Sequence, residues 1–195
     1  MDCLSDADTE CSAWLHRCSS VPVARRCCKL LEWSMHGLPW LTVTSALLIW
    51  SVATEQPPET VESVATVFAA LLVDLAVVGL MKLSVRRRRP PYNRGDSIAD
   101  APFADEFSFP SGHTTRTVTL VSIFCASLDR RPWHLPAQMF AAMLGLSRIV
   151  LGRHYISDVL AALFIGQLTA QLVFYIYTPY ALLRFFVQCV RELFQ

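Results

Sequence analysis

Three short motifs combine cationic side chains with two histidines and a carboxylate. They are KLSVRRRRP from Lys82 to Pro90, PSGH from Pro110 to His113, and SRIVLGRHYISD from Ser147 to Asp158. Lysine binds phosphate oxygens as a point charge, and arginine binds them through a planar fork of donors. Histidine next to a carboxylate can act as a nucleophile or as a general acid and base. Together the motifs predict chemistry on a phosphate group.

The phosphate-binding part of the predicted site comes from all three motifs. Lys82, Arg89 and Arg148 supply fixed positive charges. Ser111 and Gly112 precede a predicted helix start, where free backbone N–H groups and the helix dipole favour an anion. Gly112 has no side chain, so the backbone can approach a ligand closely. We therefore predict that these five residues bind phosphate.

The two histidines are predicted to divide the chemistry. His154 and Asp158 are spaced i, i+4, which puts them on one face of a helix. A carboxylate bonded to one ring nitrogen leaves the other nitrogen as a nucleophile, so His154 is expected to attack phosphorus and form a phosphohistidine. His113 is expected to protonate the leaving oxygen and then to activate water. Because the cations bind phosphate without a metal, and no acidic pair indicates a magnesium site, we expect no metal and no cofactor.

The elements that position these motifs are long and apolar. The residues of the AVILMFWYC set make up 53% of the 195-residue chain and charged residues only 17%. Five runs are almost free of charge, namely Leu38–Ala53, Val61–Met81, Thr114–Leu128, Trp133–Leu151 and Val159–Leu183. A spanning helix needs roughly 17–25 mainly apolar residues. The pattern predicts an all-α integral-membrane bundle of about five spanning helices.

The order of the runs places the motifs on one side of the membrane. The second run ends at the first motif, and the third run begins at His113. The fourth run returns at Arg148, and the fifth leaves from Asp158. The net charge is only +1, whereas nucleic-acid-binding proteins normally carry a strong basic excess. We expect a lipid phosphate as substrate, membrane lipids as surroundings and no nucleic acid as partner.

The N-terminal region differs from the rest of the chain. Residues 1–36 mix apolar with basic residues and predict an amphipathic interfacial helix, followed by a membrane domain over residues 37–195. The seven cysteines show no zinc-binding spacing. We interpret them as reduced thiols, with acylation of Cys27 and Cys28 as the alternative.

The three motifs resemble the signature of the type 2 phosphatidic acid phosphatase (PAP2) superfamily, which reads KxxxxxxRP, PSGH and SRxxxxxHxxxD. The stretches 83–90, 108–116 and 144–154 are similar to one branch, the polyisoprenoid diphosphate/phosphate phosphohydrolases, which include presqualene diphosphatase. The resemblance implies a haloperoxidase-like helical bundle. It also implies magnesium-independent hydrolysis of presqualene, farnesyl and geranylgeranyl diphosphate in the endoplasmic reticulum or nuclear envelope.

The same resemblance assigns roles to individual residues. It implies that Lys82, Arg89, Ser111, Gly112 and Arg148 bind phosphate, and that the catalytic residues are His113 as acid, His154 as nucleophile and Asp158 as the residue that orients it. The family commonly has six spanning helices, so the N-terminal amphipathic segment is expected to stand in for the first.

Several alternatives remain open in the sequence. The substrate class could instead be phosphatidate or sphingoid phosphates, the site could be that of a vanadium haloperoxidase, or the chain could be a non-catalytic membrane scaffold. Asp74 is either a structural partner or part of the site, and Arg116 either contacts phosphate or reaches the membrane interface.

The distribution of basic residues predicts which side of the membrane carries the site. The predicted site face carries an excess of arginine and lysine over the opposite face, which has Arg130, Arg131, Arg184 and Arg191. This excess favours a cytosolic site by the positive-inside rule.

Overall fold

The computed structural model of the chain describes the backbone of residues 2–94, 106–127 and 131–193, and side chains within residues 6–94, 106–127 and 132–176. Over these residues the regular secondary structure is helical, and an isolated β-bridge joins Arg88 to Phe107. The helices are α1 (Asp2–His16), η1 (Arg17–Ser20), α2 (Pro22–Ser34), α3 (Gly37–Ala53), α4 (Pro58–Val85), α5 (Gly112–Ser127), η2 (Arg131–Trp133), α6 (His134–Val150) and α7 (Ile156–Leu193). The predicted all-α class is confirmed.

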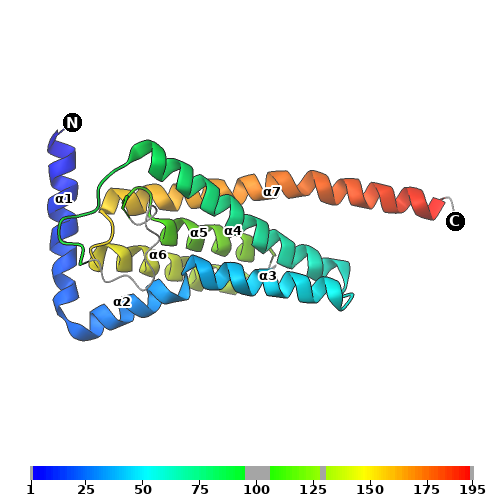
Figure 1. Cartoon of the computed structure of the whole chain (residues 1–195), viewed down its shortest axis with the longest axis horizontal. Helices are drawn as coiled ribbons and strands as arrows, with labels where there is room; N and C mark the ends of the chain where they lie inside the picture. Colours follow the sequence, from blue (N-terminus) through cyan, green and yellow to red (C-terminus); the bar gives the residue numbers. More distant parts are fainter. Residues whose placement is uncertain (1, 95–105, 128–130, 194–195) are drawn as a thin grey trace.

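Helices α3 to α7 form an elongated bundle, and α1 crosses one end of it (Figure 1). Helix α5 lies among α4, α6 and α7, and it packs most extensively against α7. Helix α3 packs against α4, while α2 packs against α6 before the chain turns into α3. The N-terminal helices therefore attach to the bundle at the end where α4, α6 and α7 meet the connecting loops.

The five predicted apolar runs correspond in order to α3 to α7; the described residues of the third run lie in α5, and the fourth run extends one residue beyond α6 at each end. Three helical stretches in the described part of the chain are long and apolar enough to cross a membrane: Pro22–Ala53, Pro58–Val85 and Ile156–Ile176. Helices α5 and α6 have only 16 and 17 residues. At about 1.5 Å per residue, such helices fall short of a hydrocarbon core about 30 Å thick.

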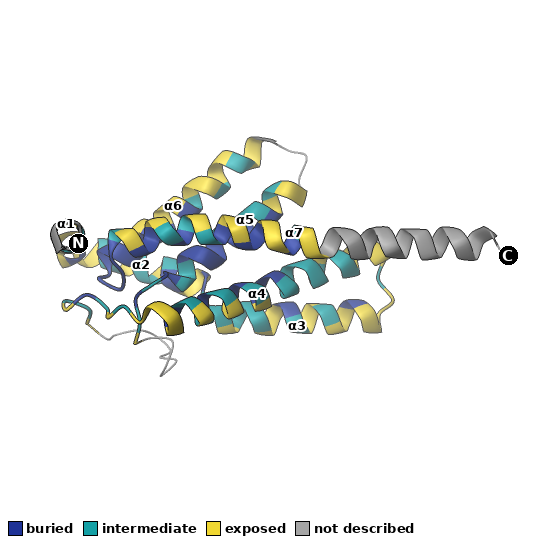
Figure 2. Cartoon of the chain, turned by 90° about the horizontal axis from the view of Figure 1, so that it is seen from above, coloured by how far each residue is buried: buried dark blue, intermediate teal, exposed yellow. Residues whose placement is uncertain are grey.

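The polarity of the bundle is that of a membrane protein. Large apolar side chains are exposed along α3, α4, α6 and α7, for example Leu47, Leu72, Met143 and Phe164 (Figure 2). Small polar side chains are buried instead, and α5 buries four threonines at positions 114, 115, 117 and 119. Helices in lipid pack through small and hydrogen-bonding residues, because apolar side chains gain nothing by leaving the lipid. The exposed apolar surface therefore faces the bilayer.

The N-terminal region forms two helices that each bury a polar side chain against the protein and expose large apolar ones. Ser12 on α1 and Glu32 on α2 are buried, whereas Trp14, Leu30 and Trp33 are exposed. Sequence analysis predicted an interfacial helix, and the exposed apolar residues fit that interpretation. The buried polar residues go further, because they attach this region to the end of the bundle by specific contacts.

Asp74 and Arg116 form an ion pair inside the bundle. The Arg116 guanidinium lies 3.5 Å from the Asp74 carboxylate and donates a hydrogen bond of 3.0 Å to the Met35 carbonyl oxygen. Arg116 is buried, so it does not reach the membrane interface as one sequence alternative proposed. The pair joins α4 to α5, and the bond to Met35 holds the junction between α2 and α3 against both.

The packing of α5 on α7 depends on a close backbone approach at Gly166. A Cβ atom at this position would lie 2.6 Å from the Thr115 carbonyl oxygen and 2.8 Å from Cβ of Val118. At Gly79 on α4, an added Cβ atom would meet nothing within 4 Å. The two glycines therefore offer a matched pair of helix-interior substitutions.

We expect Gly166→Ala to lower the melting temperature of the detergent-solubilised protein by about 2–10 °C, because overpacking typically costs about 1–3 kcal/mol. Gly79→Ala should leave the melting temperature unchanged or raise it, since alanine favours helix more than glycine does. Thermal unfolding followed by tryptophan fluorescence measures both. Equal melting temperatures for the two variants would contradict the close α5–α7 contact.

Candidate active site

The three sequence motifs meet at the end of the bundle that α1 crosses (Figure 1). Lys82 is in the last turn of α4, which is followed by Arg86 in a left-handed conformation. His113 is in the first turn of α5, which begins at Gly112. Arg148 is in the last turn of α6, and His154 lies in the short connection to α7. The predicted convergence of the motifs on one face is therefore seen in the structure.

The short pairing of residues 87–88 with residues 107–108 brings two carbonyl groups into the site. The Ser108 N–H donates to the Arg87 carbonyl oxygen at 2.8 Å, next to the bridge between Arg88 and Phe107. The Phe107 carbonyl oxygen then accepts a hydrogen bond of 3.0 Å from Lys82 Nζ. The adjacent Ser108 carbonyl oxygen lies 2.6 Å from Nδ1 of His154.

The contact with Ser108 fixes the tautomer of His154. A carbonyl oxygen can only accept a hydrogen bond, so Nδ1 of His154 carries the proton in this contact. Nε2 is then the nitrogen with the free lone pair. The ring is buried, with 2% of its surface exposed. The side chain is thus in the form that a nucleophile requires, but a backbone carbonyl holds it there.

The hydrogen bond expected between His154 and Asp158 is not formed. Nδ1 of His154 lies 3.9 Å from Oδ2 of Asp158, beyond hydrogen-bond distance. Oδ2 instead accepts from the Tyr155 N–H at 2.9 Å. Asp158 is the third residue of α7 and Tyr155 immediately precedes the helix, so this contact is the reach-back half of a capping box. In this structure the closer contact of Asp158 is with the backbone that follows His154.

The other oxygen of Asp158 binds Arg87. Oδ1 accepts a hydrogen bond of 2.7 Å from Nη1 of Arg87, whose guanidinium lies over the Tyr155 ring at 3.9 Å. Nη2 of Arg87 donates to Asp8 on α1 at 2.8 Å. Asp8 also accepts the N–H of Ser157 at 3.1 Å. Arg87 thus connects α1 to the first turn of α7.

Cations surround His154. Burial lowers the pKa of His154 well below its usual value, and the charges of Arg89, Arg148 and Lys82 lower this pKa further, whereas the bond to Ser108 opposes the shift. The three predicted phosphate-binding cations are thus close enough to act on the charge of one imidazole. A neutral His154 in a cationic surrounding suits attack on an anionic phosphate group.

His113 lies in the same group of side chains. Arg148 and His154 are close enough to interact with it electrostatically, and its ring lies 5.9 Å from that of His36, edge to face. Nε2 of His113 and Nε of Arg148 are buried and have no hydrogen-bond partner among the described residues. Buried polar atoms normally have partners, so these two nitrogens are available to a ligand.

Ser111 and Gly112 lie at the start of α5, and both make contacts within the protein. The Ser111 hydroxyl pairs with the Thr114 hydroxyl at 2.9 Å, and the Ser111 N–H donates to the Asp158 carbonyl oxygen at 3.4 Å. The hydroxyl and the N–H of Ser111 therefore each have a partner within the protein. A Cβ atom at Gly112 would lie 3.3 Å from the Val78 side chain, so the glycine permits close packing of α5 on α4. In this conformation Ser111 connects α5 to α7.

Sequence analysis missed Glu32, which is the acidic partner of the site. Oε1 of Glu32 lies 2.6 Å from Nη1 of Arg148 and 3.4 Å from Nε of Arg153. Arg153 is fully buried and also donates to Asn93 at 2.9 Å. The available signal was a single acidic residue between apolar neighbours in an otherwise basic segment.

Sequence analysis also missed the contacts that α1 makes with the α6–α7 loop. Nδ1 of His16 lies 2.8 Å from the Val150 carbonyl oxygen, and the ring stacks on Tyr92 at 4.7 Å. The Ser12 hydroxyl accepts the N–H of Ile156 at 2.9 Å. No pattern in the sequence pointed to these contacts, because each joins residues far apart in the chain.

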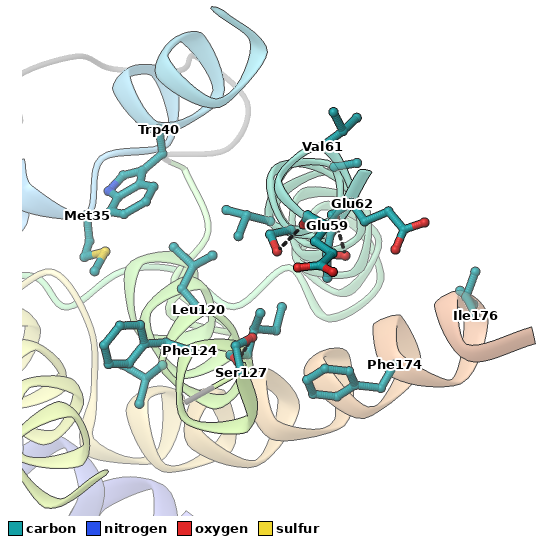
Figure 3. Close-up of a pocket in the computed structure, with 16 residues that line it drawn as sticks. Met35, Trp40, Glu59, Val61, Glu62, Leu120, Phe124, Ser127, Phe174 and Ile176 are labelled. Atoms are coloured by element: carbon teal, nitrogen blue, oxygen red, sulfur yellow. Dashed lines mark hydrogen bonds between the residues drawn. The ribbon is translucent and has the colours of Figure 1, made fainter. Parts of the chain in front are cut away.

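An apolar cavity lies in the half of the bundle away from the motifs. It has a volume of about 1050 Å³ and is lined by residues of α3, α4, α5 and α7, with Met35 and Trp40 at one end (Figure 3). Glu59 and Glu62 also border it. The lining includes none of the predicted phosphate-binding or catalytic residues. Among the described residues, no group of three or more histidine, cysteine or acidic side chains is arranged to hold a metal ion.

The chain is similar to known phosphatases in sequence. It is 35% identical over 127 residues to "Probable lipid phosphate phosphatase beta" of Arabidopsis thaliana, an alignment that covers 51% of this chain and 59% of the relative. It is 35% identical over 105 residues to "Decaprenylphosphoryl-5-phosphoribose phosphatase" of Mycobacterium tuberculosis, covering 54% and 56%. The chain thus spans less than two thirds of the length of these relatives.

Two solved structures share the fold. The transmembrane PAP2 type phosphatidylglycerolphosphate phosphatase from Bacillus subtilis superposes with a TM-score of 0.69 at 19% identity, covering 92% of this chain and 88% of that one. Aquifex aeolicus LpxE superposes with a TM-score of 0.62 at 20% identity, covering 84% and 92%. The sequence profile of the PAP2 superfamily matches residues 63–181, a range that contains all three motifs. This integral-membrane chain therefore belongs to the PAP2 superfamily.

Proposed function

We propose that the chain is a membrane lipid phosphatase that hydrolyses polyisoprenoid diphosphates and monophosphates, such as presqualene, farnesyl and geranylgeranyl diphosphate, through a phosphohistidine on His154. The observation that carries the proposal is the contact of His154 with the Ser108 carbonyl oxygen. It commits Nδ1 as a donor and leaves Nε2 as the nucleophile near Lys82, Arg89 and Arg148.

The first half-reaction transfers the phosphoryl group to His154. Nε2 attacks phosphorus, a P–N bond forms, and the bond between phosphorus and the leaving oxygen breaks. His113 donates its proton to that oxygen. The leaving group is therefore the isoprenoid monophosphate when the substrate is a diphosphate, and the isoprenoid alcohol when the substrate is a monophosphate. Lys82, Arg89 and Arg148 stabilise the charge on the equatorial phosphate oxygens in the transition state.

The second half-reaction releases inorganic phosphate. His113, now neutral, takes a proton from water while the water oxygen attacks phosphorus and the P–N bond breaks. His154 returns to its neutral form and His113 to its protonated form. Asp158 acts through the loop, since it holds the Tyr155 N–H at the start of α7. No step requires a metal ion.

Two observations support an isoprenoid lipid as substrate. The Mycobacterium tuberculosis relative is named as a phosphatase of a decaprenylphosphoryl compound. The apolar cavity reaches Met35, and the neighbouring His36 packs against His113. An apolar chain with its phosphate at His113 can therefore keep its tail among apolar side chains and lipid. A general lipid phosphate phosphatase is the competing proposal, favoured by the name of the Arabidopsis thaliana relative.

The proposal also covers the membrane in which the enzyme lies and the side of that membrane on which its site faces. We assign the enzyme to the endoplasmic reticulum or nuclear envelope with its site on the cytosolic face. Arg116 and Arg153 are buried in ion pairs and no longer count as interfacial charges. Arg26, Arg86, Arg88 and Arg94 are exposed on the site face and keep its basic excess. The side chains of the four arginines on the opposite face lie outside the described residues.

We expect His154→Ala to lower phosphatase activity by at least about 10³-fold, because the variant has no nucleophile. The measurement is phosphate release from farnesyl diphosphate by purified protein in detergent micelles with EDTA present. His134→Ala, at the opposite end of α6, is the matched control and should stay within about twofold of wild type. Equal activity of wild type and His154→Ala would refute the mechanism, and loss of wild-type activity in EDTA would refute its independence of metal.

Substrate preference separates the two lipid classes. We expect kcat/KM for presqualene or farnesyl diphosphate to exceed that for phosphatidate by about tenfold or more, a difference of about 1.4 kcal/mol in transition-state binding. Each lipid is presented at the same mole fraction in the same micelles. A preference for phosphatidate would favour the general lipid phosphate phosphatase and overturn the isoprenoid assignment.

The acid side of the pH profile reports on His154. Only the neutral imidazole attacks phosphorus, and burial together with the nearby cations lowers the pKa of His154 below its usual value of 6.5. The activity limited by this group should therefore persist as the pH falls through 6.5 and be lost only at lower pH. We expect kcat/KM to fall at the same acid pH for farnesyl monophosphate and farnesyl diphosphate, because the titrating group is on the enzyme. A midpoint at or above pH 6.5 would contradict the buried, cation-surrounded imidazole.

A further inference from the structure

Glu32 makes a close ionic contact with Arg148, one of the predicted phosphate-binding cations. Its carboxylate is 3% exposed and comes from α2, in the region that precedes all three motifs. Oε1 lies 2.6 Å from Nη1 of Arg148 and 3.4 Å from Nε of Arg153. The contact joins residues that are 116 positions apart in the chain.

Burial makes this contact a constraint on the direction of the Arg148 side chain. Arg148 is 2% exposed, so its guanidinium cannot turn toward water. A buried guanidinium without a counter-charge costs several kcal/mol, which ties Nη1 to the Glu32 carboxylate. Because the guanidinium is planar, fixing Nη1 also fixes the directions in which the other N–H groups point. Nε of Arg148 has no hydrogen-bond partner among the described residues and is left for a ligand.

We propose that Glu32 is a positioning residue for phosphoryl transfer: it holds Arg148 so that the remaining guanidinium donors face the phosphate oxygens, and it makes α2 part of the active site. This inference rests on the proposed function, in which Arg148 binds phosphate. Glu32 itself does not contact the substrate.

The sign of the effect follows from the charge of Glu32. A carboxylate near the site weakens ground-state binding of an anion, so removing it does not reduce the affinity for substrate. Correct orientation of Arg148 matters most when charge develops on the equatorial oxygens, since preorganised donors act chiefly in the transition state. Loss of Glu32 should therefore lower kcat and leave KM equal or smaller.

The test compares Glu32→Gln with Glu10→Gln, which makes the same change at an exposed position on α1. We expect Glu32→Gln to lower kcat for farnesyl diphosphate about tenfold or more while KM stays equal or falls. Inhibition by orthovanadate, which imitates the transferring phosphoryl group, should weaken in parallel with kcat, and Glu10→Gln should match wild type. A Glu32→Gln enzyme with unchanged kcat and unchanged vanadate inhibition overturns the proposal.

A double-mutant cycle with Arg148→Lys separates positioning from a general loss of structure. Lysine has no planar fork to orient, so Glu32→Gln should reduce kcat by less than about threefold further in that background. The full tenfold loss in the Arg148→Lys background would show that Glu32 acts elsewhere and would overturn the proposal. If Glu32→Gln does not fold, Glu32→Asp keeps the charge but retracts it by one methylene, and the same kcat loss is expected.

A binding measurement keeps this inference distinct from the proposed function. Orthovanadate should raise the melting temperature of the wild type and of Glu10→Gln, and raise that of Glu32→Gln less. This result supports the positioning role even if none of the tested lipids is hydrolysed. Absence of lipid hydrolysis would refute only the substrate proposal. If the wild type hydrolyses lipid and vanadate raises the melting temperatures of all three proteins equally, the positioning role is overturned and the proposed function is not. Absence of any vanadate effect on wild type also overturns it.

Discussion

Positive charge buried at one end of an apolar bundle constrains the rest of this structure. Arginine cannot lose its proton in a protein, so each buried guanidinium needs an acidic partner nearby. The chain supplies those partners from other helices: Asp74 on α4 for Arg116 on α5, and Glu32 on α2 for Arg148 on α6. Asp8 on α1 and Asp158 on α7 share Arg87. The pairs therefore set which helices lie together at that end.

The same concentration of charge explains how the site treats its histidines. A carboxylate bonded directly to the His154 ring would favour the charged imidazolium. The Ser108 carbonyl instead fixes the tautomer with a neutral group, while cations nearby disfavour a second proton. Asp158 keeps its place in the motif because it organises the first turn of α7 and binds Arg87. Orientation and charge are thus handled by different groups.

The sequence predicted most of what depends on local pattern. Apolar runs predicted the helices of the bundle, and the spacing of Lys82, His113 and Arg148 relative to those runs predicted that they would meet at one end. The sequence could not predict which of several possible hydrogen-bond acceptors a side chain would contact. His154 had both a carboxylate and an unrecognised carbonyl within reach, and the carbonyl made the closer contact.

The contacts of the N-terminal region were hidden for a related reason. A single glutamate in a basic amphipathic segment reads as a solvated charge, and only the fold shows that Glu32 lies against Arg148. Ser111 likewise makes contacts that its position at a helix start did not suggest, with the Thr114 hydroxyl and the Asp158 carbonyl oxygen. Periodicity and spacing do not predict which residues far apart in the sequence form hydrogen bonds or ion pairs in the site.

The pairing of residues 87–88 with residues 107–108 has an evolutionary consequence. It closes the long connection between α4 and α5 at its base, and the two carbonyls that hold Lys82 and His154 belong to that base. Changes in the connection that leave Arg89 and the contact of Asn93 with Arg153 in place can therefore accumulate without displacing the reactive groups. Descendants of such a protein can acquire new lipid preferences through the connection while inheriting the same hydrolytic machinery.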